Sequence, residues 1–179
     1  AVVNKWICDP RWSWFGGRNL HGLAAITTRY AVEGDFSLDL FFATMMMVND
    51  PPYEMLGNYC FTVCGDGADI SDGYTFFIGG GMNEWIGVSR GDDILKRNHR
   101  DGRYYSFLPV DNRIEFLSND VVHQRWYHVK IEREGNTLSF WFEGKKYYSF
   151  TDPDPLPGGH ITLWTYRNGM MLSLSLIHI

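Results

Sequence analysis

The stretch RWYHVKIEREGNTLSFWFEGKKYYSFTDPDPLPGGHITLWTYRNG, residues 125–169, decides the fold. Apolar and polar side chains alternate along 127–133 and 138–143, on either side of the turn Glu134-Gly135-Asn136. A second Glu-Gly turn leads into a further short run at 146–150. Because successive side chains of a strand point to opposite faces, this period of two predicts antiparallel strands joined by tight hairpins.

The same alternation recurs along the rest of the chain. Residues 35–42 place four large apolar side chains on one face, and we expect further strands at 2–8, 24–32, 59–64, 74–79, 85–90, 160–166 and 170–178. The polar region 96–120 is expected to be a long excursion with one strand near 113–117. About ten short strands separated by Gly, Asn, Asp and Pro turns predict an all-β, two-sheet antiparallel sandwich. No repeat or linker divides it, so residues 1–179 are expected to form a single domain.

Composition excludes several classes of protein. The 179 residues are 45% hydrophobic and 21% charged, which is typical of a chain that buries a core rather than of a disordered one. The formal net charge is −5, whereas surfaces that bind phosphate groups are usually basic. Nucleic acids and anionic membranes are therefore not expected partners. The apolar runs are only a few residues long, and a membrane-spanning helix needs about 20, so membrane insertion is not expected either.

Three cysteines, Cys8, Cys60 and Cys64, are too few for a disulfide framework. In a strand, Cys60 and Cys64 share one face but lie about 13 Å apart, which is too far for a bridge. Buried, unpaired thiols are the favoured interpretation. Cys8 could still pair with either of the others, so the redox compartment stays open.

The order of these segments resembles a known fold family. A strand that starts at Trp126, a hairpin, the loop Asp152-Pro-Asp-Pro-Leu156 and a Gly-led Ile-x-Leu strand are similar to the C-terminal half of concanavalin A-like (laminin-G-like) lectin and glucanase jelly rolls. Residues 34–41 look like an early strand of that family, and 6–15 and 72–80 look like segments of its uncharacterised bacterial members. The resemblance implies a jelly roll in an extracellular or periplasmic bacterial protein, complete or part of a larger multidomain protein. It leaves the function open, because this fold hosts lectins, carbohydrate-binding modules, glycoside hydrolases, polysaccharide lyases and adhesive modules.

No catalytic residue is predicted. A retaining glycosidase needs two carboxylates about 5–5.5 Å apart, and the resembled family supplies them as Glu-x-Asp-x-x-Glu on one strand. Glu33-Gly34-Asp35 begins such a pattern, but residue 38 is Leu where the acid should stand. Glu132-Arg133-Glu134 also lacks the third acid. Carboxylates that are distant in the sequence could still converge in the fold.

One loop has the composition of a cation site. Asp66, Asp69 and Asp72 stand among glycines, and many members of the resembled fold carry a structural calcium ion. Their spacing matches no defined calcium loop. The alternative is a plain turn in which the carboxylates accept hydrogen bonds from the backbone. No cofactor is otherwise required.

Aromatic side chains beside polar ones are the best-supported candidates for binding. A pyranose ring has an apolar face of C–H groups and a rim of hydroxyls, so exposed indole or phenol rings flanked by hydrogen-bonding groups can bind it. Three places qualify: Trp85 with Asn83 and Arg90; the strand face that carries His160, Thr162, Trp164 and Tyr166 opposite Ile161 and Leu163; and Trp12 with Trp14. The alternative in each case is that the ring packs between the sheets.

The sequence therefore favours non-catalytic binding of an oligosaccharide or polysaccharide. The expected contacts are stacking on Trp164, Tyr166 and Trp85 and hydrogen bonds from His160, Asn83 and Arg90. The first alternative is a glycoside hydrolase or polysaccharide lyase with its acid and base on the concave sheet. The second is a structural or adhesive module whose aromatic face binds another protein.

Overall fold

The structure is a computed structural model that describes residues 5–9, 14–44, 58–80, 85–99 and 126–178. Its strands, in chain order, are β1 (Lys5–Asp9), β2 (Trp14–Thr27), β3 (Val32–Glu33), β4 (Phe36–Thr44), β5 (Tyr59–Gly65), β6 (Tyr74–Gly79), β7 (Trp85–Arg90), β8 (Asp93–His99), β9 (Trp126–Glu134), β10 (Thr137–Phe142), β11 (Lys145–Thr151) and β12 (Gly158–His178). Every pair of neighbouring strands is antiparallel, in the order β11-β10-β9-β4-β12-β5-β6-β7-β8.

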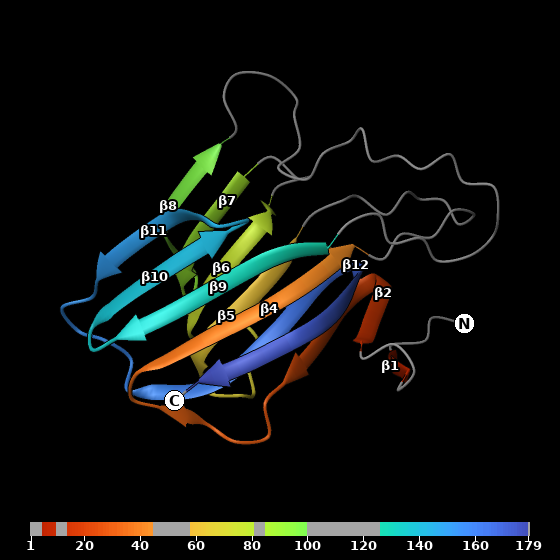
Figure 1. Ribbon diagram of the computed structural model, residues 1–179, viewed down its shortest axis with the longest axis horizontal. Coiled ribbons are helices and arrows are strands. Elements are labelled where there is room, and N and C mark those ends of the chain that lie inside the picture. Colours follow the sequence, from red (N-terminus) through yellow and green to blue (C-terminus); the bar gives the residue numbers. More distant parts are fainter. Residues whose placement is uncertain (1–4, 10–13, 45–57, 81–84, 100–125, 179) are drawn as a thin grey trace.

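The two layers of the sandwich share strand β12. Its first half lies between β2 and β5, and its second half lies between β2 and β4. Figure 1 shows the layer of β4, β9, β10 and β11 in front of the layer of β5, β6, β7 and β8. The predicted all-β, two-sheet antiparallel architecture is confirmed.

A bulge marks the passage of β12 from one layer to the other. The pairing with β2 shifts between Tyr166 and Asn168, and Arg167 between them has a φ of 52°. Bulges of this kind bend a strand and increase its local twist. The separate strands expected at 160–166 and 170–178 are therefore the two halves of one strand, and the Arg-Asn-Gly sequence between them is its bend.

Aromatic side chains fill the space between the layers. Phe42 contacts Phe61 with their ring centroids 5.4 Å apart, and Phe76 stacks on Phe140 at 5.0 Å. These contacts join β4 to β5 and β6 to β10, so they bridge the layers rather than follow one sheet. On β4 and β9 the buried side chains are those at alternate positions, such as Leu38 and Leu40 on β4. On these strands the period of two read from the sequence reports which side chains enter the core.

Some strand boundaries differ from the sequence prediction. Strand β2 begins at Trp14 rather than at 24. Strand β8 occupies part of the stretch expected to be an excursion. It is the last strand in the order, and its side chains at 93–98 are exposed, so it has no buried face to produce an apolar period. The strand expected near 113–117 lies outside the described residues.

The cysteine prediction is confirmed in part. Cys60 and Cys64 are free and buried, but they do not share a face. Cys64 belongs to the core cluster, whereas Cys60 lines a pocket on the opposite side of the sheet. A φ of 59° at Cys64 interrupts the strand's alternation, which explains the difference. In the described part of the chain, no helix is long and apolar enough to span a membrane.

A buried polar cluster fixes the loop between β11 and β12 to the sandwich. Tyr74 donates a hydrogen bond of 2.6 Å to Asp152 Oδ2, and Arg90 Nη1 lies 3.0 Å from the same oxygen. The backbone amide of Leu156 in turn donates to the Tyr74 hydroxyl. The hydrogen bond from Tyr74, with the Arg90 charge, lowers the pKa of Asp152, and burial raises the pKa of Tyr74 to about 12.

This cluster predicts a stability that depends on pH. A carboxylate whose pKa is lower in the folded state stabilises the fold above its unfolded pKa of about 4, and that stability is lost as the pH falls through the folded pKa. We expect Asp152→Asn to lower the free energy of unfolding by about 1–3 kcal/mol at neutral pH. The difference from the wild type should shrink below about pH 4.

Urea denaturation across this pH range measures the effect. Asp154→Asn is the matched control, because its carboxylate is 95% exposed and lies 3.7 Å from Arg90 Nη2. The prediction would be contradicted if both variants lost the same free energy of unfolding, or if the loss for Asp152→Asn did not change with pH.

Candidate functional site

The outer face of the β12-β5-β6-β7 layer carries two contrasting rows of side chains. Directly paired residues of antiparallel strands share a face, so the register defines each row. One row holds only hydroxyl side chains, from Thr27, Thr162, Thr62, Thr75 and Ser89. The adjacent row alternates small with large side chains, in the order Ala25, Trp164, Cys60, Phe77 and Gly87. Large aromatic rings with small residues between them leave a depression in the sheet surface.

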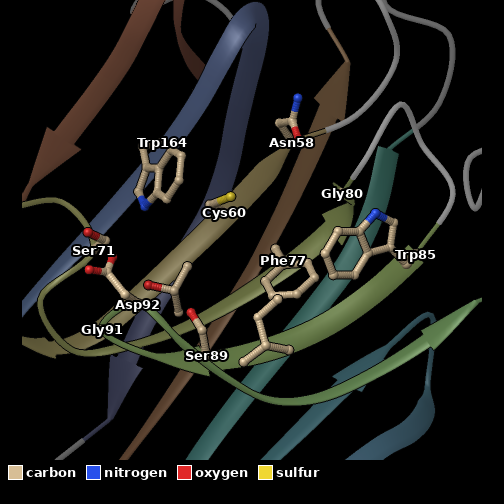
Figure 2. A pocket seen from close by; sticks show the side chains of 12 residues that line it. Asn58, Cys60, Ser71, Phe77, Gly80, Trp85, Ser89, Gly91, Asp92 and Trp164 are labelled. Atoms are coloured by element: carbon tan, nitrogen blue, oxygen red, sulfur yellow. The ribbon is translucent and has the colours of Figure 1, made fainter.

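A pocket of about 290 Å³ occupies this depression. Its lining includes Asn58, Cys60, Ser71, Phe77, Trp85, Ser89, Asp92, Ile94 and Trp164. Trp85 and Trp164, which the sequence placed in two separate candidate sites, thus line the same pocket from β7 and β12 (Figure 2). Ile161 and Leu163 lie in the core, as the alternation of 160–166 predicted, and Trp164 is only partly buried.

The indole of Trp164 is held in place by the hydroxyl of Thr62. Trp164 Nε1 donates to Thr62 Oγ1 at 3.0 Å, and the Thr62 hydroxyl donates to the carbonyl of Ile70 at 2.7 Å. Thr75 Oγ1 lies 2.8 Å from Thr62 Oγ1 and completes its second acceptor position. All of the hydrogen-bonding capacity of Thr62 is therefore used, so the indole has one preferred position.

The aspartate-rich loop between β5 and β6 presents the Ile70 carbonyl that accepts the hydrogen bond from Thr62. Asp66 Oδ1 accepts hydrogen bonds from the amides of Ala68 and Asp69, and Asp69 Oδ1 accepts two from Ser71. The bonds from Ser71 lower the pKa of Asp69. These turns carry the Ile70 carbonyl to Thr62 and bring Ser71 to the pocket.

Calcium at Asp66, Asp69 and Asp72 stays a prediction. Across the described ranges, no three His, Cys, Asp or Glu side chains form a group that could hold a metal ion. The hydrogen bonds of Asp66 and Asp69 are those of the alternative, in which the aspartates shape a turn.

The opposite wall consists of Phe77 and Trp85. Their rings meet edge to face, with centroids 5.2 Å apart. Gly87 makes room for the Phe77 ring, because a Cβ atom there would lie 2.4 Å from Phe77 Cζ. The guanidinium of Arg97 lies 4.7 Å from the centroid of a Trp85 ring.

Three polar residues lie at the other end of the pocket. Figure 2 shows Ser71, Ser89 and Asp92 on the side away from Trp85. Asp92 stands in the turn between β7 and β8, is exposed, and has no hydrogen-bond or ion-pair partner among the residues that the structure describes. The sequence reading missed Asp92, because Gly91-Asp92-Asp93 has the composition of any surface turn.

Two residues expected to bind sugar do not line this pocket. His160 Nδ1 lies 2.8 Å from the carbonyl oxygen of Thr28, and its ring packs against Gly67. Arg90 points to the core side of the sheet, where Asp152 binds its guanidinium. In both cases a contact within the fold engages a side chain that the sequence analysis assigned to the sugar.

The remaining candidates lie beyond the pocket or outside the described part of the chain. Tyr166 is 40% exposed on the same face of β12, opposite Leu23. Asn83 and Trp12 fall outside the described residues, and so does the side chain of Trp14.

Carboxylates that could form a catalytic pair are scarce at this site. Within the described lining of the pocket, Asp92 is the only acidic side chain. Asp35 of the incomplete Glu-x-Asp pattern caps a hairpin instead, since its Oδ1 accepts a hydrogen bond of 2.6 Å from the Gly135 amide. Asp39 lies on the other layer, where its Oδ1 is 2.7 Å from His128 Nε2.

Comparison with known proteins finds similarity in structure only. No protein-family model matches the chain, and no curated protein matches it in sequence. The carbohydrate-binding module CBM66 from Bacillus subtilis has a TM-score of 0.67 at 13% identity, over 99% of this chain and 92% of that chain. A β-glucanase from Bacillus licheniformis has a TM-score of 0.57 at 7% identity, over 98% of this chain and 82% of that chain. An alginate lyase from a Corynebacterium species has a TM-score of 0.54 at 10% identity, over 99% of this chain and 82% of that chain.

These similarities show the fold. The chain is a concanavalin A-like jelly roll, as the resemblance read from its sequence implied. At such low identities, the function must be argued from the pocket itself.

The hydrogen bonds of Thr62 predict the effect of removing its hydroxyl. Thr62→Val keeps the shape of the side chain but leaves Trp164 Nε1 and the Ile70 carbonyl without partners. We expect a loss of about 1–3 kcal/mol in the free energy of unfolding, measured in urea, because unsatisfied buried polar groups are costly. The near-ultraviolet circular dichroism of the native protein should also change, since one indole loses its fixed position.

The control for this substitution is Thr137→Val. It breaks a similar hydroxyl pair, Thr137 with Thr151 at 2.9 Å, at an exposed position on β10. Its effect should stay within about 0.5 kcal/mol. The indole's dependence on Thr62 is refuted if the two valine variants have the same stability and the same spectrum.

Proposed function

We propose that the pocket between Trp164 and Trp85 binds one unit of an oligosaccharide or polysaccharide without cleaving it. The observation that carries this proposal is the convergence of two indoles and a polar end on one open pocket. A sugar ring can place its C–H face against an aromatic plane while its hydroxyls reach the polar end. The volume of about 290 Å³ lies at the lower limit of typical ligand pockets, which suits one ring rather than a buried chain.

The hydrogen bonds to the sugar would come from residues other than those first expected. Asn58, Ser71, Ser89 and Asp92 line the pocket and offer amide, hydroxyl and carboxylate groups. Their oxygen atoms accept from sugar hydroxyls, and the hydroxyl and amide groups can also donate. They take the place of His160 and Arg90, which are engaged elsewhere.

Binding is favoured over hydrolysis because of the carboxylate arrangement. Glycoside hydrolysis uses two carboxylates, about 5–5.5 Å apart in retaining enzymes and about 6.5–9.5 Å apart in inverting ones. The described lining of the pocket offers Asp92 alone. We also propose an extracellular or periplasmic place of action, the location expected from the sequence.

Substitution of either indole tests the proposal. Trp164→Ala and Trp85→Ala should each weaken binding by about 5- to 150-fold, because stacking on one aromatic ring is worth about 1–3 kcal/mol in the analogous case of nucleobases. The ligand is first found on a glycan array, and the affinity for it is then measured by isothermal titration calorimetry. Trp141→Ala is the matched control, since this indole lies on β10 in the other layer, between the ammonium groups of Lys130 and Lys146.

Three results would contradict the proposal. Unchanged affinity in both pocket variants would remove the support for this site. Release of reducing ends or unsaturated sugars from a polysaccharide panel would establish a hydrolase or lyase instead. A chain that binds no glycan but co-purifies with a protein partner, lost on Trp164→Ala, would establish an adhesive module.

A further inference from the structure

We infer that the pocket selects an uncharged sugar unit and rejects acidic ones, and that Asp92 is the residue that determines this specificity. The inference rests on the proposed function and names the class of ligand for the same site. It depends on where Asp92 lies, on what surrounds it and on the absence of a compensating cation among the described lining residues.

Asp92 is placed to meet a ligand. It lines the pocket at its polar end, beside Ser71 and Ser89, and opposite the Trp85 wall (Figure 2). Within the described ranges, its carboxylate contacts no cation and accepts no hydrogen bond. Asp66, Asp69 and Asp152 contrast with it, since each accepts hydrogen bonds that shape the fold. The free carboxylate of Asp92 is therefore available to a bound molecule.

The charge around Asp92 is negative. The loop that supplies Ser71 also carries Asp69 and Asp72, both exposed, and Asp93 follows Asp92 directly. Among the described residues that line the pocket there is no Lys, Arg or His. The formal net charge of the chain, −5, adds to the same potential. A carboxylate or sulfate on the ligand would meet like charge at this end, with nothing in the described lining to neutralise it.

A carboxylate suits hydroxyl groups well. An ionised Asp only accepts hydrogen bonds, and its two oxygens can bind two neighbouring hydroxyls of a sugar ring. Bonds to a charged acceptor are shorter and about twice as strong as those between neutral groups. The same group repels a uronate, so one side chain both attracts the correct ligand and rejects the wrong one.

Arg97 is the residue that could reverse this preference. It lies on strand β8, where it pairs with Gly87 of β7, and its guanidinium lies over the Trp85 ring. A ligand carboxylate at the Trp85 end could bind it. Arg97 is not among the described residues that line the pocket, and its charge lies over Trp85, at the end of the pocket away from Asp92.

Binding to two polysaccharide panels tests the inference. Uncharged polysaccharides (glucan, mannan, galactan, xylan) and polyuronates (alginate, polygalacturonate) are compared with the whole chain by affinity gel electrophoresis, in EDTA and at two salt concentrations. We expect retention by a member of the first panel and none by the second. Asp92→Asn should weaken binding to the uncharged ligand by roughly 10- to 150-fold, the range for hydrogen bonds to charged groups. The same substitution should also lower the ratio of the affinity for the uncharged ligand to the affinity for polyuronates.

Two control variants separate the possible causes. Asp93→Asn removes an adjacent charge that does not line the pocket, and it should leave affinity for the uncharged ligand within about twofold. Arg97→Gln should likewise leave the affinity for the uncharged ligand within about twofold.

The inference and the proposed function can fail separately. Retention by polyuronates that is lost in Trp164→Ala and in Arg97→Gln would keep the sugar site but overturn the charge assignment. An affinity for the uncharged ligand that Asp92→Asn leaves unchanged would also overturn the inference alone. If neither panel binds, or if binding does not depend on Trp164 and Trp85, the proposed function fails and the inference fails with it.

Discussion

The register between β12 and its neighbours is the constraint on which the site depends. Trp164 pairs with Cys60, Cys60 with Phe77, and Phe77 with Gly87, so hydrogen bonds between backbones decide which side chains stand in one row. A slip of one residue in β12 would exchange Trp164 with Leu163, placing the indole in the core and the leucine on the surface. The apolar face of the layer prevents this slip, because Ile161 and Leu163 are packed inside the sandwich. The core thus fixes the geometry of a site that lies on the other side of the sheet.

How much of this structure the sequence could predict depends on whether each pattern reflects neighbouring residues or residues distant along the chain. Alternation along one strand is a local property, so it correctly placed Ile161 and Leu163 inside and Trp164 on the other face. The order of strands in the sheet is not local, and nothing in the pattern indicated that β7 and β12 bring Trp85 and Trp164 to one pocket. The contacts that engage His160 and Arg90 come from Thr28 and Asp152, which are distant along the chain. Alternation along a strand shows which face of the sheet a side chain occupies, but it does not show which distant residues contact that side chain.

Asp92 and Thr62 show the same limit at the level of single residues. An aspartate in a Gly-Asp-Asp turn and a threonine in an apolar strand are ordinary in a sequence of this class. Their importance comes from position, since one lies at the polar end of the pocket and the other accepts the hydrogen bond of Trp164. The exposed strand β8 was missed for a related reason, because an edge strand without a buried face lacks the apolar period that reveals a strand.

The fixed position of Trp164 bears on how a shallow surface pocket can bind a polar ligand. Ordering a flexible side chain on binding costs about 0.5–1.5 kcal/mol, a large share of what one stacked ring contributes. Here the fold has already met that cost, because Thr62 holds the indole and the loop that carries Ile70 and Ser71 holds Thr62. The loop therefore performs two tasks, since the same turn that fixes the aromatic wall through Ile70 delivers a hydroxyl to the polar end. A distortion of that turn would displace the apolar and the polar halves of the pocket together, so the aspartates whose hydrogen bonds shape the turn are part of what forms the site.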